Sequence, residues 1–453
     1  MMHAADTICA PATSVGAGAV SVVRISGPQA HAVVDALVRF RSGSAAQAKG
    51  YSLKFGEIDG LDEVLVSLFR APHSYTGEDA AEICCHASPF IVGTLLDRLA
   101  DAGCRLAEPG EFTRRAFVNG KMDLAQAEAV ADVIAASSAA QHRVAMNQLR
   151  GGYSAELREL RKQLLELTAL MELELDFSEE DVEFADRSRL RMLLDTACSH
   201  CRQLADSFRL GNAIRNGVPV AIVGAPNSGK STLLNALLQD DRAIVSDIPG
   251  TTRDTVEETC VIDGVLFRFI DTAGIREAGD EIERLGVERT FRKISEAEIV
   301  LGVVDATMPQ DAVSEAIRAI MEHVDPAQQK VLILANKTDM TGQSAIPTDT
   351  GCEVLPVSAK YGTGLDELRA ALAARAGVAS ASGTLVTNAR HAAALRAAAD
   401  SLRIVSDGLD RGLSTELLSE DLRAALESLG SITGQITTDQ VLGEIFSRFC
   451  IGK

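Results

Sequence analysis

The sequence has no long hydrophobic run, no basic leader and no tryptophan. No stretch approaches the roughly 18 to 20 consecutive apolar residues that a transmembrane helix needs, which argues against membrane insertion. The first residues, MMHAADTICAPATS, have neither the basic start nor the apolar core of a secretory signal peptide. Nine cysteines, an odd number spread over 453 residues, are typical of free thiols in a reducing compartment. We therefore expect a cytoplasmic protein.

Positive charge is also scarce. The chain has 44 Lys and Arg against 63 Asp and Glu, so its formal net charge is −19. A surface this acidic repels phosphate backbones, so the chain alone is not expected to bind nucleic acid strongly. An RNA substrate would require a basic patch or a basic partner.

Length and hydrophobic pattern predict several domains. A chain of 453 residues exceeds what one hydrophobic core usually serves. Residues 1–118 alternate short apolar runs with Gly and Pro, which indicates a small α+β domain. Helical periodicity fills residues 119–215 and 379–453, and alternating strands and helices fill 216–378, which indicates a parallel sheet covered by helices. Because the last segment is short for a core of its own, we expect one helical bundle, made from both helical segments, with the α/β domain inserted between them.

Residues 224–231, GAPNSGKS, fit the phosphate-loop pattern and lie between the strand-like VPVAIV and the helix-like STLLNALL. Glycines in such a loop let backbone N–H groups surround phosphates, and the start of the helix favours their negative charge. Lys230 is expected to reach the β- and γ-phosphates, and Ser231 to bind Mg²⁺. The predicted contacts of the loop are Asn227, Ser228, Gly229, Lys230, Ser231 and Thr232.

Three more motifs specify the nucleotide. DTAG follows the strand-like LFRFI, NKTD follows VLILA, and SAK follows a third such run. The carboxylate of Asp339 can accept both N–H groups of a guanine edge, which separates guanine from adenine readers. The four motifs in this order predict a GTP-binding domain that resembles the Ras-like and translation-factor GTPases. Their predicted contact residues are Asp271, Thr272, Ala273, Gly274, Asn336, Lys337, Thr338, Asp339, Ser358, Ala359 and Lys360.

One position departs from the Ras-like pattern. Many Ras-like proteins have a water-orienting Gln after the DxxG glycine, where this chain has Ile275. Hydrolysis is therefore either slow or assisted by another group. Asn227 could place its amide oxygen beside a monovalent cation, with further oxygens from VSDIPGTTRD (245–254), so that K⁺ would act like an arginine finger; alternatively, Asn227 only caps the loop. Glu283 in the acidic run EAGDEIERLG could position water, although such runs are usually solvated surface.

Motifs throughout the chain resemble the MnmE (TrmE) family of tRNA-modification GTPases: VVRISG, TGED, PGEFTRRAF, NGKMDLAQAEA, GxPNxGKS, DIxGTTRD, DTAGxRE, NKxD and the terminal FCIGK. The resemblance implies a multidomain fold with an N-terminal α+β folate-binding and dimerisation domain, an α-helical bundle built from two segments, and an inserted Ras-like α/β GTPase domain activated by K⁺. It also implies a homodimer that joins an FAD-dependent GidA-type partner in a heterotetramer. With tRNA as substrate, this complex would add an aminomethyl or carboxymethylaminomethyl group to C5 of the wobble uridine, using a carbon from 5-formyl- or methylene-tetrahydrofolate.

The resemblance further implies individual roles. The implied K⁺ ligands are the side chains of Asn227 and Thr251 and the carbonyls of Ser246 and Ile248. The implied Mg²⁺ ligands are Ser231 and Thr252. Glu283 would act on the attacking water through a second water. The loop assigned in this way to nucleotide and cations is Ser246, Asp247, Ile248, Pro249, Gly250, Thr251 and Thr252. The implied folate-site residues are Arg24, Glu82, Lys121 and Lys453.

The chain ends in Phe-Cys-Ile-Gly-Lys, an apolar run where a frayed polar end is usual. A lipidation box is one interpretation of Cys450, but C-I-G-K has an unsuitable last residue and no upstream polybasic run. We expect instead that the terminus docks in the folate site, where Cys450 would serve as nucleophile, proton donor or packed thiol. A different class of function, a regulatory GTPase switch in ribosome assembly, would have no use for folate binding by residues 1–118.

Overall fold

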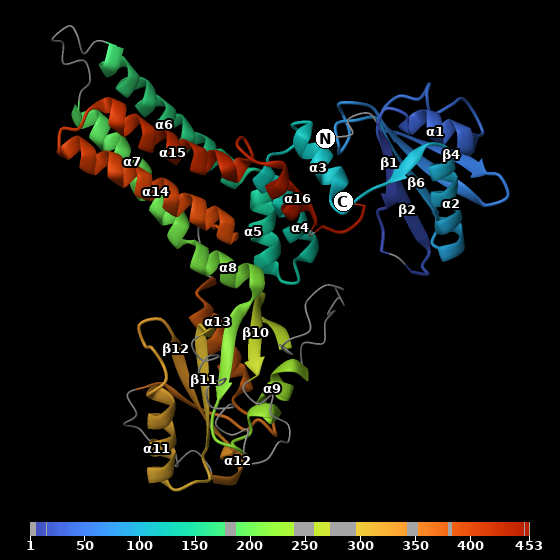
Figure 1. Ribbon diagram of the computed structural model, residues 1–453. Coiled ribbons are helices and arrows are strands. Elements are labelled where there is room, and N and C mark those ends of the chain that lie inside the picture. Colours follow the sequence, from blue (N-terminus) through green and yellow to red (C-terminus); the bar gives the residue numbers. More distant parts are fainter. Residues whose placement is uncertain are drawn as a thin grey trace, which may run out of the picture. The chain divides into compact units, whose positions relative to one another are not determined.

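The structure is a computed structural model that describes residues 6–14, 16–176, 187–239, 258–271, 296–341, 352–378, 383–447 and 449–452. The chain folds into two compact units, one made from three segments of sequence and the other from two. The helices and strands are labelled in Figure 1. The first unit consists of Met1–Ala131, Gln148–Glu172 and Leu422–Lys453. The second consists of Asp132–Asn147 and Leu173–Asp421. The two ends of the sequence therefore belong to the same unit.

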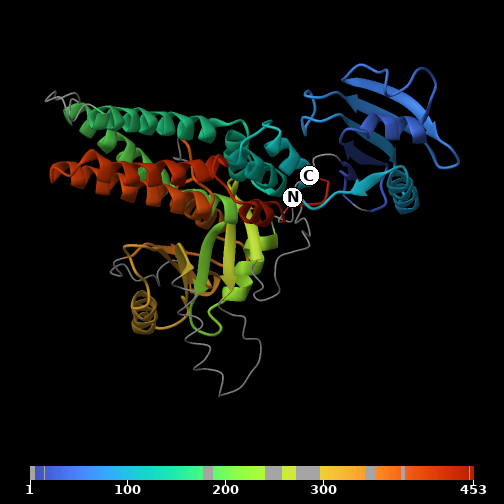
Figure 2. The same cartoon turned by 45° about the horizontal axis from the view of Figure 1, so that its top comes forward.

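A seven-stranded sheet forms the N-terminal part of the first unit, in the order β3-β4-β5-β6-β2-β1-β7. Its strands are drawn in blue in Figure 2. Its strands are β1 (Thr7–Pro11), β2 (Val20–Ser26), β3 (Arg39–Phe40), β4 (Ser52–Ile58), β5 (Asp62–Phe69), β6 (Ala80–His86) and β7 (Cys104–Leu106). Neighbouring strands are antiparallel except β1 and β7, which are parallel. This mixed sheet with helices is the α+β fold that the pattern of residues 1–118 predicts.

Strand alternation gives this sheet one core face and one open face. In β5, Val64, Val66 and Leu68 are buried, while Leu65 between them is exposed, as the two-residue period of a strand requires. The buried side chains pack against α1 (Ala30–Leu37) and α2 (Pro89–Asp101) in one hydrophobic core. The opposite face is therefore the one available to a site.

Helices from both ends of the sequence pack together in the first unit. They are α3 (Glu111–Val118), α4 (Leu124–Ala135) and α16 (Asp439–Ser447). Their shared apolar cluster buries Leu124, Ala127, Val130, Leu442, Phe446 and Phe449. This cluster joins the last residues of the chain to α4.

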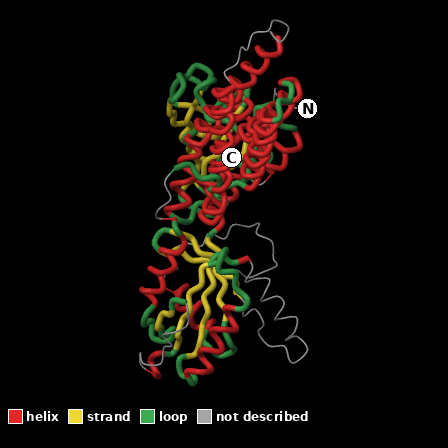
Figure 3. Tube along the Cα trace, turned by 90° about the vertical axis from the view of Figure 1, so that its left-hand side faces the viewer, coloured by secondary structure: helices red, strands yellow, loops and turns green. Residues whose placement is uncertain are grey.

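The second unit contains a six-stranded sheet in the order β13-β12-β11-β8-β10-β9 (Figure 3). Its strands are β8 (Val218–Val223), β9 (Glu258–Ile262), β10 (Val265–Asp271), β11 (Ile299–Asp305), β12 (Lys330–Asn336) and β13 (Val354–Pro356). All pairs are parallel except β9 with β10. The helices around it are α9 (Lys230–Gln239), α11 (Gln310–Met321), α12 (Thr338–Thr341) and α13 (Leu365–Ala376).

The strands of this sheet are buried on both faces. On β8, Val220 and Ile222 pack in the core that includes α9 and α13, while Ala221 and Val223 pack toward the opposite face. On that opposite face, α11 contributes Val313 and other apolar side chains. Helices on both faces of a parallel sheet are the arrangement predicted from the alternation of strands and helices.

The two helical segments of the sequence also meet within the second unit. There α7 (Arg187–Asp206) lies along α14 (Ala389–Asp410), with the Cys198 thiol 3.5 Å from the Ala399 carbonyl oxygen. This pairing confirms that helices from before and after the α/β segment pack together. The remaining helices among the described residues are α5 (Ala139–Leu149), α6 (Gly152–Asp176), α8 (Phe208–Asn216) and α15 (Thr415–Thr433); most of α6 and of α15 belongs to the first unit. The domain boundaries drawn at residues 118, 215 and 378 stay predictions.

Across the described part of the chain, no helix combines the length and apolar character that crossing a membrane requires.

Candidate functional site

The phosphate loop, residues 224–229, connects β8 to α9 and contains two glycines that the packing requires. Gly224 and Gly229 have φ of +154° and +100°. A Cβ on Gly229 would lie 2.1 Å from Asn336 Nδ2, and one on Gly224 would lie 2.2 Å from the carbonyl oxygen of Val303. Neither position has room for a larger residue, so the backbone itself forms the surface that faces a phosphate.

The start of α9 places a cation and two hydroxyls beside this loop. Lys230 Nζ donates hydrogen bonds to the carbonyl oxygens of Gly224 at 2.9 Å and Ala225 at 2.8 Å, so its ammonium lies over the loop. Ser231 and Thr232 are exposed in the first turn of the helix. First-turn N–H groups and the helix dipole add positive potential there. The arrangement suits a phosphate chain with a hard cation.

Asn336 joins the NKTD and SAK motifs to the phosphate loop. Its side-chain amide is buried, and Nδ2 donates to the carbonyl oxygen of Ser228 at 2.8 Å, although the two residues are 108 positions apart. Its Oδ1 accepts a hydrogen bond from the Ala359 N–H at 3.0 Å. One amide therefore connects NKTD, SAK and the phosphate loop.

Neighbouring side chains hold Asp339 and Lys337, two residues of the NKTD motif. Asp339 Oδ1 accepts a hydrogen bond from Ser358 Oγ at 2.7 Å. Lys337 Nζ lies 2.6 Å from Asp305 Oδ2, at the end of β11. Burial alone would raise the pKa of Asp305, but hydrogen bonds from Lys337 and Thr307 outweigh it and hold the pKa below its usual range. Sequence reasoning missed Asp305; its only signal is an acidic residue directly after the apolar strand IVLGVV.

A second polar site lies on the open face of the N-terminal sheet. Arg24 and Glu82 are directly opposite each other on β2 and β6, and Arg24 Nε and Nη2 are each 2.9 Å from Glu82 Oε1. The Arg24 guanidinium also lies 5.3 Å from the ring centre of Tyr75 and 5.7 Å from that of Phe112. Lys121 Nζ donates to the Pro72 carbonyl oxygen at 2.8 Å, at the start of the turn that carries Tyr75. Sequence reasoning did not single out Tyr75 or Phe112.

The chain's last residues contact this second site. Arg24 Nη1 donates to the carbonyl oxygen of Gly452 at 3.3 Å. The Gly110 N–H, at the start of α3, lies 3.4 Å from the carbonyl oxygen of Cys450. Phe449 is buried, whereas Cys450 is exposed. The tail thus runs from the helical cluster to the Arg24 pair.

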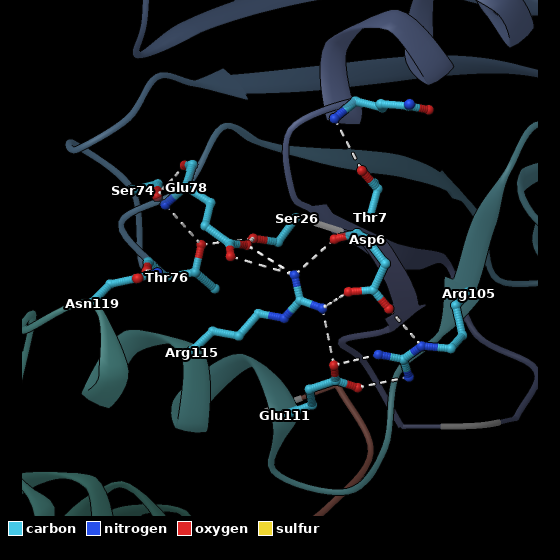
Figure 4. A network of polar contacts seen from close by, with 11 residues as sticks. Asp6, Thr7, Ser26, Ser74, Thr76, Glu78, Arg105, Glu111, Arg115 and Asn119 are labelled. Atoms are coloured by element: carbon cyan, nitrogen blue, oxygen red, sulfur yellow. Dashed lines mark hydrogen bonds and ion pairs between the residues drawn. The ribbon is translucent and has the colours of Figure 1, made fainter. Parts of the chain in front are cut away.

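A network of ion pairs centred on Arg115 supports the second site (Figure 4). The Arg115 guanidinium lies 2.6 Å from Asp6, 3.0 Å from Glu111 and 3.3 Å from Glu78. Arg105 binds Asp6 and Glu111 from the other side, at 2.8 and 2.6 Å. Burial alone would raise the pKa of both Asp6 and Glu111, but hydrogen bonds from the two arginines outweigh it and hold each pKa below its usual range.

The same network holds the turn in which Tyr75 lies. Ser26 Oγ donates to Glu78 at 2.8 Å, and Asn119 Nδ2 donates to the Thr76 carbonyl oxygen at 2.7 Å (Figure 4). The Tyr75 hydroxyl lies 2.9 Å from Thr113 Oγ1 on α3. The turn is therefore attached to β2 on one side and to α3 on the other.

Known proteins match this chain from end to end. A model of the MnmE helical domain matches residues 124–450, and a model of the GTP-binding protein TrmE N-terminus matches residues 7–121. The chain belongs to the MnmE family. Proteins named tRNA modification GTPase MnmE are 50% identical to it in Bacteroides fragilis, over 466 residues that cover 99% of both chains. The Porphyromonas gingivalis protein of the same name is 50% identical over 467 residues, covering 99% of this chain and 98% of that one.

Part of the site expected for an MnmE-family protein lies within the described residues. The structure brings together Asn336, Asp339, Ser358 and the phosphate loop in one place, and Arg24 and Glu82 in another. The predicted site residues that lie outside the described ones are Ser246, Asp247, Ile248, Pro249, Gly250, Thr251, Thr252, Thr272, Ala273, Gly274, Glu283 and Lys453. Asp271 ends β10, in register with Ile222 of β8. The functional roles assigned to all of these residues stay predictions.

The described residues fit the ligands that the MnmE family implies. The glycine cradle, Lys230 and the exposed Ser231 hydroxyl suit a phosphate chain with Mg²⁺. Asn227 is exposed at the tip of the loop with φ of +61°, and its amide oxygen is a hard donor of the kind that K⁺ takes. At the second site, a carboxylate and guanidinium donors, with the partly buried ring of Tyr75 beside them, suit a flat ring with a polar edge, such as a pterin. The ring of Phe112 is fully buried and lies beside the guanidinium.

Proposed function

We propose that the protein hydrolyses GTP as a subunit of a complex that modifies C5 of the wobble uridine in certain tRNAs. Membership of the MnmE family and the guanine-reading site support GTP hydrolysis in tRNA modification. The observation that carries the proposal is that one chain, matched end to end by this family, contains both a guanine-nucleotide site and a separate polar and aromatic site beside its own C-terminus. A simple GTPase switch has no use for the second site.

At the nucleotide site, each residue has a distinct task. Lys230 would neutralise charge on the β- and γ-phosphates, and Asp339 would accept hydrogen bonds from the guanine edge. Ser231 and Thr252 would hold Mg²⁺. K⁺, held by Asn227, Ser246, Ile248 and Thr251, would supply positive charge where negative charge develops in the transition state. Glu283 would orient the attacking water, because Ile275 cannot.

At the second site, a bound tetrahydrofolate would supply the carbon that is transferred to uridine. Arg24 and Glu82 would hold the polar edge of the pterin ring, with the rings of Tyr75 and Phe112 behind the guanidinium. Lys121 and Lys453 would bind acidic groups of the folate. Cys450, two residues before the carbonyl that Arg24 binds, would lie near the carried carbon.

The open face of the N-terminal sheet supports a homodimer. An apolar row crosses four strands on this face; its members are Val22, Cys84, Leu65 and Phe55. It lies directly beside the Arg24–Glu82 pair, and Leu65 is 42% exposed in the single chain. A second copy covering this face would remove the apolar row from water and enclose the pair. The complex with tRNA would require the FAD-dependent GidA-type partner to contribute positive charge, since this chain carries −19.

Mass analysis of wobble uridines tests the proposal. In tRNA from cells that lack the gene, we expect the C5-modified uridine to disappear and unmodified or partly modified uridine to accumulate. The unmutated gene should restore the modification, whereas Lys230→Ala should not. Unchanged wobble uridines in the deletion strain would contradict the proposed function and favour a GTPase switch.

A further inference from the structure

Cys450 lies between two points at which the tail is held. Before it, Phe449 is buried against Phe446, with 5.4 Å between the ring centres. After it, Gly452 is buried and its carbonyl oxygen accepts the hydrogen bond from Arg24. Cys450 itself and Ile451 are exposed between these two points. The thiol is thus carried on a short segment with an anchor on each side.

The anchor after Cys450 requires a glycine. Gly452 has φ of +96°, a conformation that L side chains rarely adopt. A Cβ there would lie 2.0 Å from the carbonyl oxygen of Pro11 and 3.3 Å from the Cα of Ala12. These are backbone atoms at the end of β1, which cannot move aside as a flexible side chain could. The tail can therefore lie against β1 only because residue 452 has no side chain.

The anchor before Cys450 requires a second glycine, on a different element. Gly110 has φ of +69°, and its N–H points to the carbonyl oxygen of Cys450 at 3.4 Å. A Cβ on Gly110 would lie 2.7 Å from the carbonyl oxygen of Phe446 and 3.0 Å from the Cβ of Phe449. The close contact between the start of α3 and the tail again depends on a missing side chain.

We propose that Gly110 and Gly452 are positioning residues for Cys450, and that Arg24 completes the anchor by binding the Gly452 carbonyl. Backbone contact on both sides holds the tail in one path and presents the exposed thiol two residues before the carbonyl that Arg24 binds. The inference rests on the proposed function in one respect: the thiol that is held in this way would serve the transfer of the folate-borne carbon. The placement of the tail is a separate physical claim.

A nitroxide label on Cys450 measures this placement in the full-length protein. Cys84→Ser and Cys352→Ser remove the two partly exposed cysteines and leave Cys450 as the exposed thiol, since the other six are buried. We expect an immobilised spectrum in this background. Gly452→Ala should shorten the rotational correlation time of the label several-fold, and Gly110→Ala should do the same. An immobilised label in both variants would overturn the proposal.

Two other glycines provide matched controls. Gly120 has φ of +68° but nothing within 4 Å of a Cβ, so Gly120→Ala introduces the backbone strain without the clash. Gly443 lies in α16 near the tail and also has open space around a Cβ, so Gly443→Ala adds a methyl group without either effect. Both controls should keep the label immobilised. If Gly452→Ala does not fold, Arg24→Gln takes its place, because it removes the guanidinium donor without adding bulk. This variant too should make the label on Cys450 more mobile.

The same glycine and arginine variants, made in the chain that keeps Cys84 and Cys352 and carries no label, are then compared for wobble-uridine modification in cells. We expect Gly452→Ala to lower the modification rate at least tenfold, while Gly120→Ala and Gly443→Ala leave it unchanged. A mobile label with full modification would overturn the positioning role and leave the proposed function standing. Loss of the modification in the gene-deletion strain establishes separately that the pathway depends on this protein.

Discussion

At the scale of single residues, the nucleotide site depends on a buried amide whose nitrogen and oxygen both have partners. The buried Asn336 amide donates to the phosphate loop and accepts from SAK, so any substitution leaves at least one of these partners unpaired. An unpaired buried polar group costs about 1–3 kcal/mol. Asn336 therefore holds the NKTD motif, the SAK motif and the phosphate loop together.

Asp339→Asn should change which base is bound. The amide offers one donor and one acceptor where the carboxylate offers acceptors only, so it matches xanthine better than guanine. Hydrogen bonds to a charged group contribute about 1.5–3 kcal/mol, so GTP affinity should fall roughly 10- to 100-fold. Competition binding with GTP, XTP and ATP checks this. The unmutated protein should reject ATP, and equal competition by ATP and GTP would show that NKTD does not read guanine here.

Asn227→Ala should remove the preference for K⁺ over Na⁺ in GTP hydrolysis. The amide oxygen is the one described donor of the proposed cation site, and a charge placed like an arginine finger contributes a factor of about 10³–10⁵ in rate. We expect the rate in KCl to fall at least about tenfold, toward the rate in NaCl, with GDP affinity nearly unchanged. Asn216→Ala, at the end of α8, is a control for the same substitution elsewhere. Equal rates in the two salts for the unmutated protein would contradict the cation hypothesis.

Motifs made many of these residues predictable, because their chemistry depends on residue type at fixed spacing. Asn336, Asp339 and Lys230 could be named from sequence for that reason. Asp305 and Tyr75 could not, because their partners Lys337 and Arg24 are chosen by tertiary contacts between distant segments. A single acidic or aromatic residue beside a strand has many possible roles until the register is known.

At the scale of elements, the Arg115 network decides how β1, the turn at residues 74–79 and α3 are fixed to one another. Three carboxylates face two guanidinium groups, and Arg115 is 12% exposed. The pattern of residues 1–118 predicts strands and helices of the right kind. It does not predict that Arg24 lies opposite Glu82, because a shift of one residue in register would leave the same alternation and exchange the two faces.

Arg115→Met should destabilise the N-terminal sheet by on the order of 3 kcal/mol, because it leaves partly buried carboxylates facing one another without their central cation. Arg114→Met on the same helix, whose side chain is not part of the network, is the matched control. Since the chain has no tryptophan, Tyr51→Trp, an exposed position beside Phe69, introduces a single fluorescent reporter of this sheet. Denaturant unfolding followed by its fluorescence measures the difference. Equal midpoints for the two arginine variants would contradict the role of the network.

The same reporter tests pH dependence. The pKa values of Asp6 and Glu111 are depressed in the folded chain. The two carboxylates therefore contribute fully to the free energy of unfolding at pH values above their ordinary pKa values of 3.8 and 4.5. This contribution to stability is lost as the pH falls through the lower pKa values that the two groups have in the folded chain. The stability difference between the unmutated protein and Arg115→Met should therefore be constant from pH 7 to about 5 and shrink below about pH 4. A difference that grows in acid would show that the carboxylates are not held charged by Arg115.

At the scale of the whole molecule, the first and last segments of the sequence belong to the same compact unit. The first unit combines the N-terminal sheet, part of the helical region and the last 32 residues, Leu422–Lys453, while the phosphate loop and the NKTD and SAK motifs belong to the second unit. Helical periodicity on both sides of the α/β segment made the shared bundle predictable. The contact of the tail with β1 and Arg24 could be expected only from the apolar ending, because its geometry depends on two glycines whose close contacts exist only in the folded chain.

Deletion of residues 450–453 should separate the two activities of the molecule. The deleted residues contact Gly110, the end of β1 and Arg24, all of them within the first unit, so the loss should weaken folate binding and abolish wobble-uridine modification. Phe449 remains and keeps the helical cluster closed, since burying such a side chain contributes about 1.5–3 kcal/mol. K⁺-stimulated GTP hydrolysis should stay near normal, because Lys230, Asn336 and Asp339 lie in the second unit. Phosphate release in KCl and nucleoside mass analysis of tRNA from cells carrying only the truncated protein measure the two activities, and full modification in those cells would contradict a docked, functional terminus.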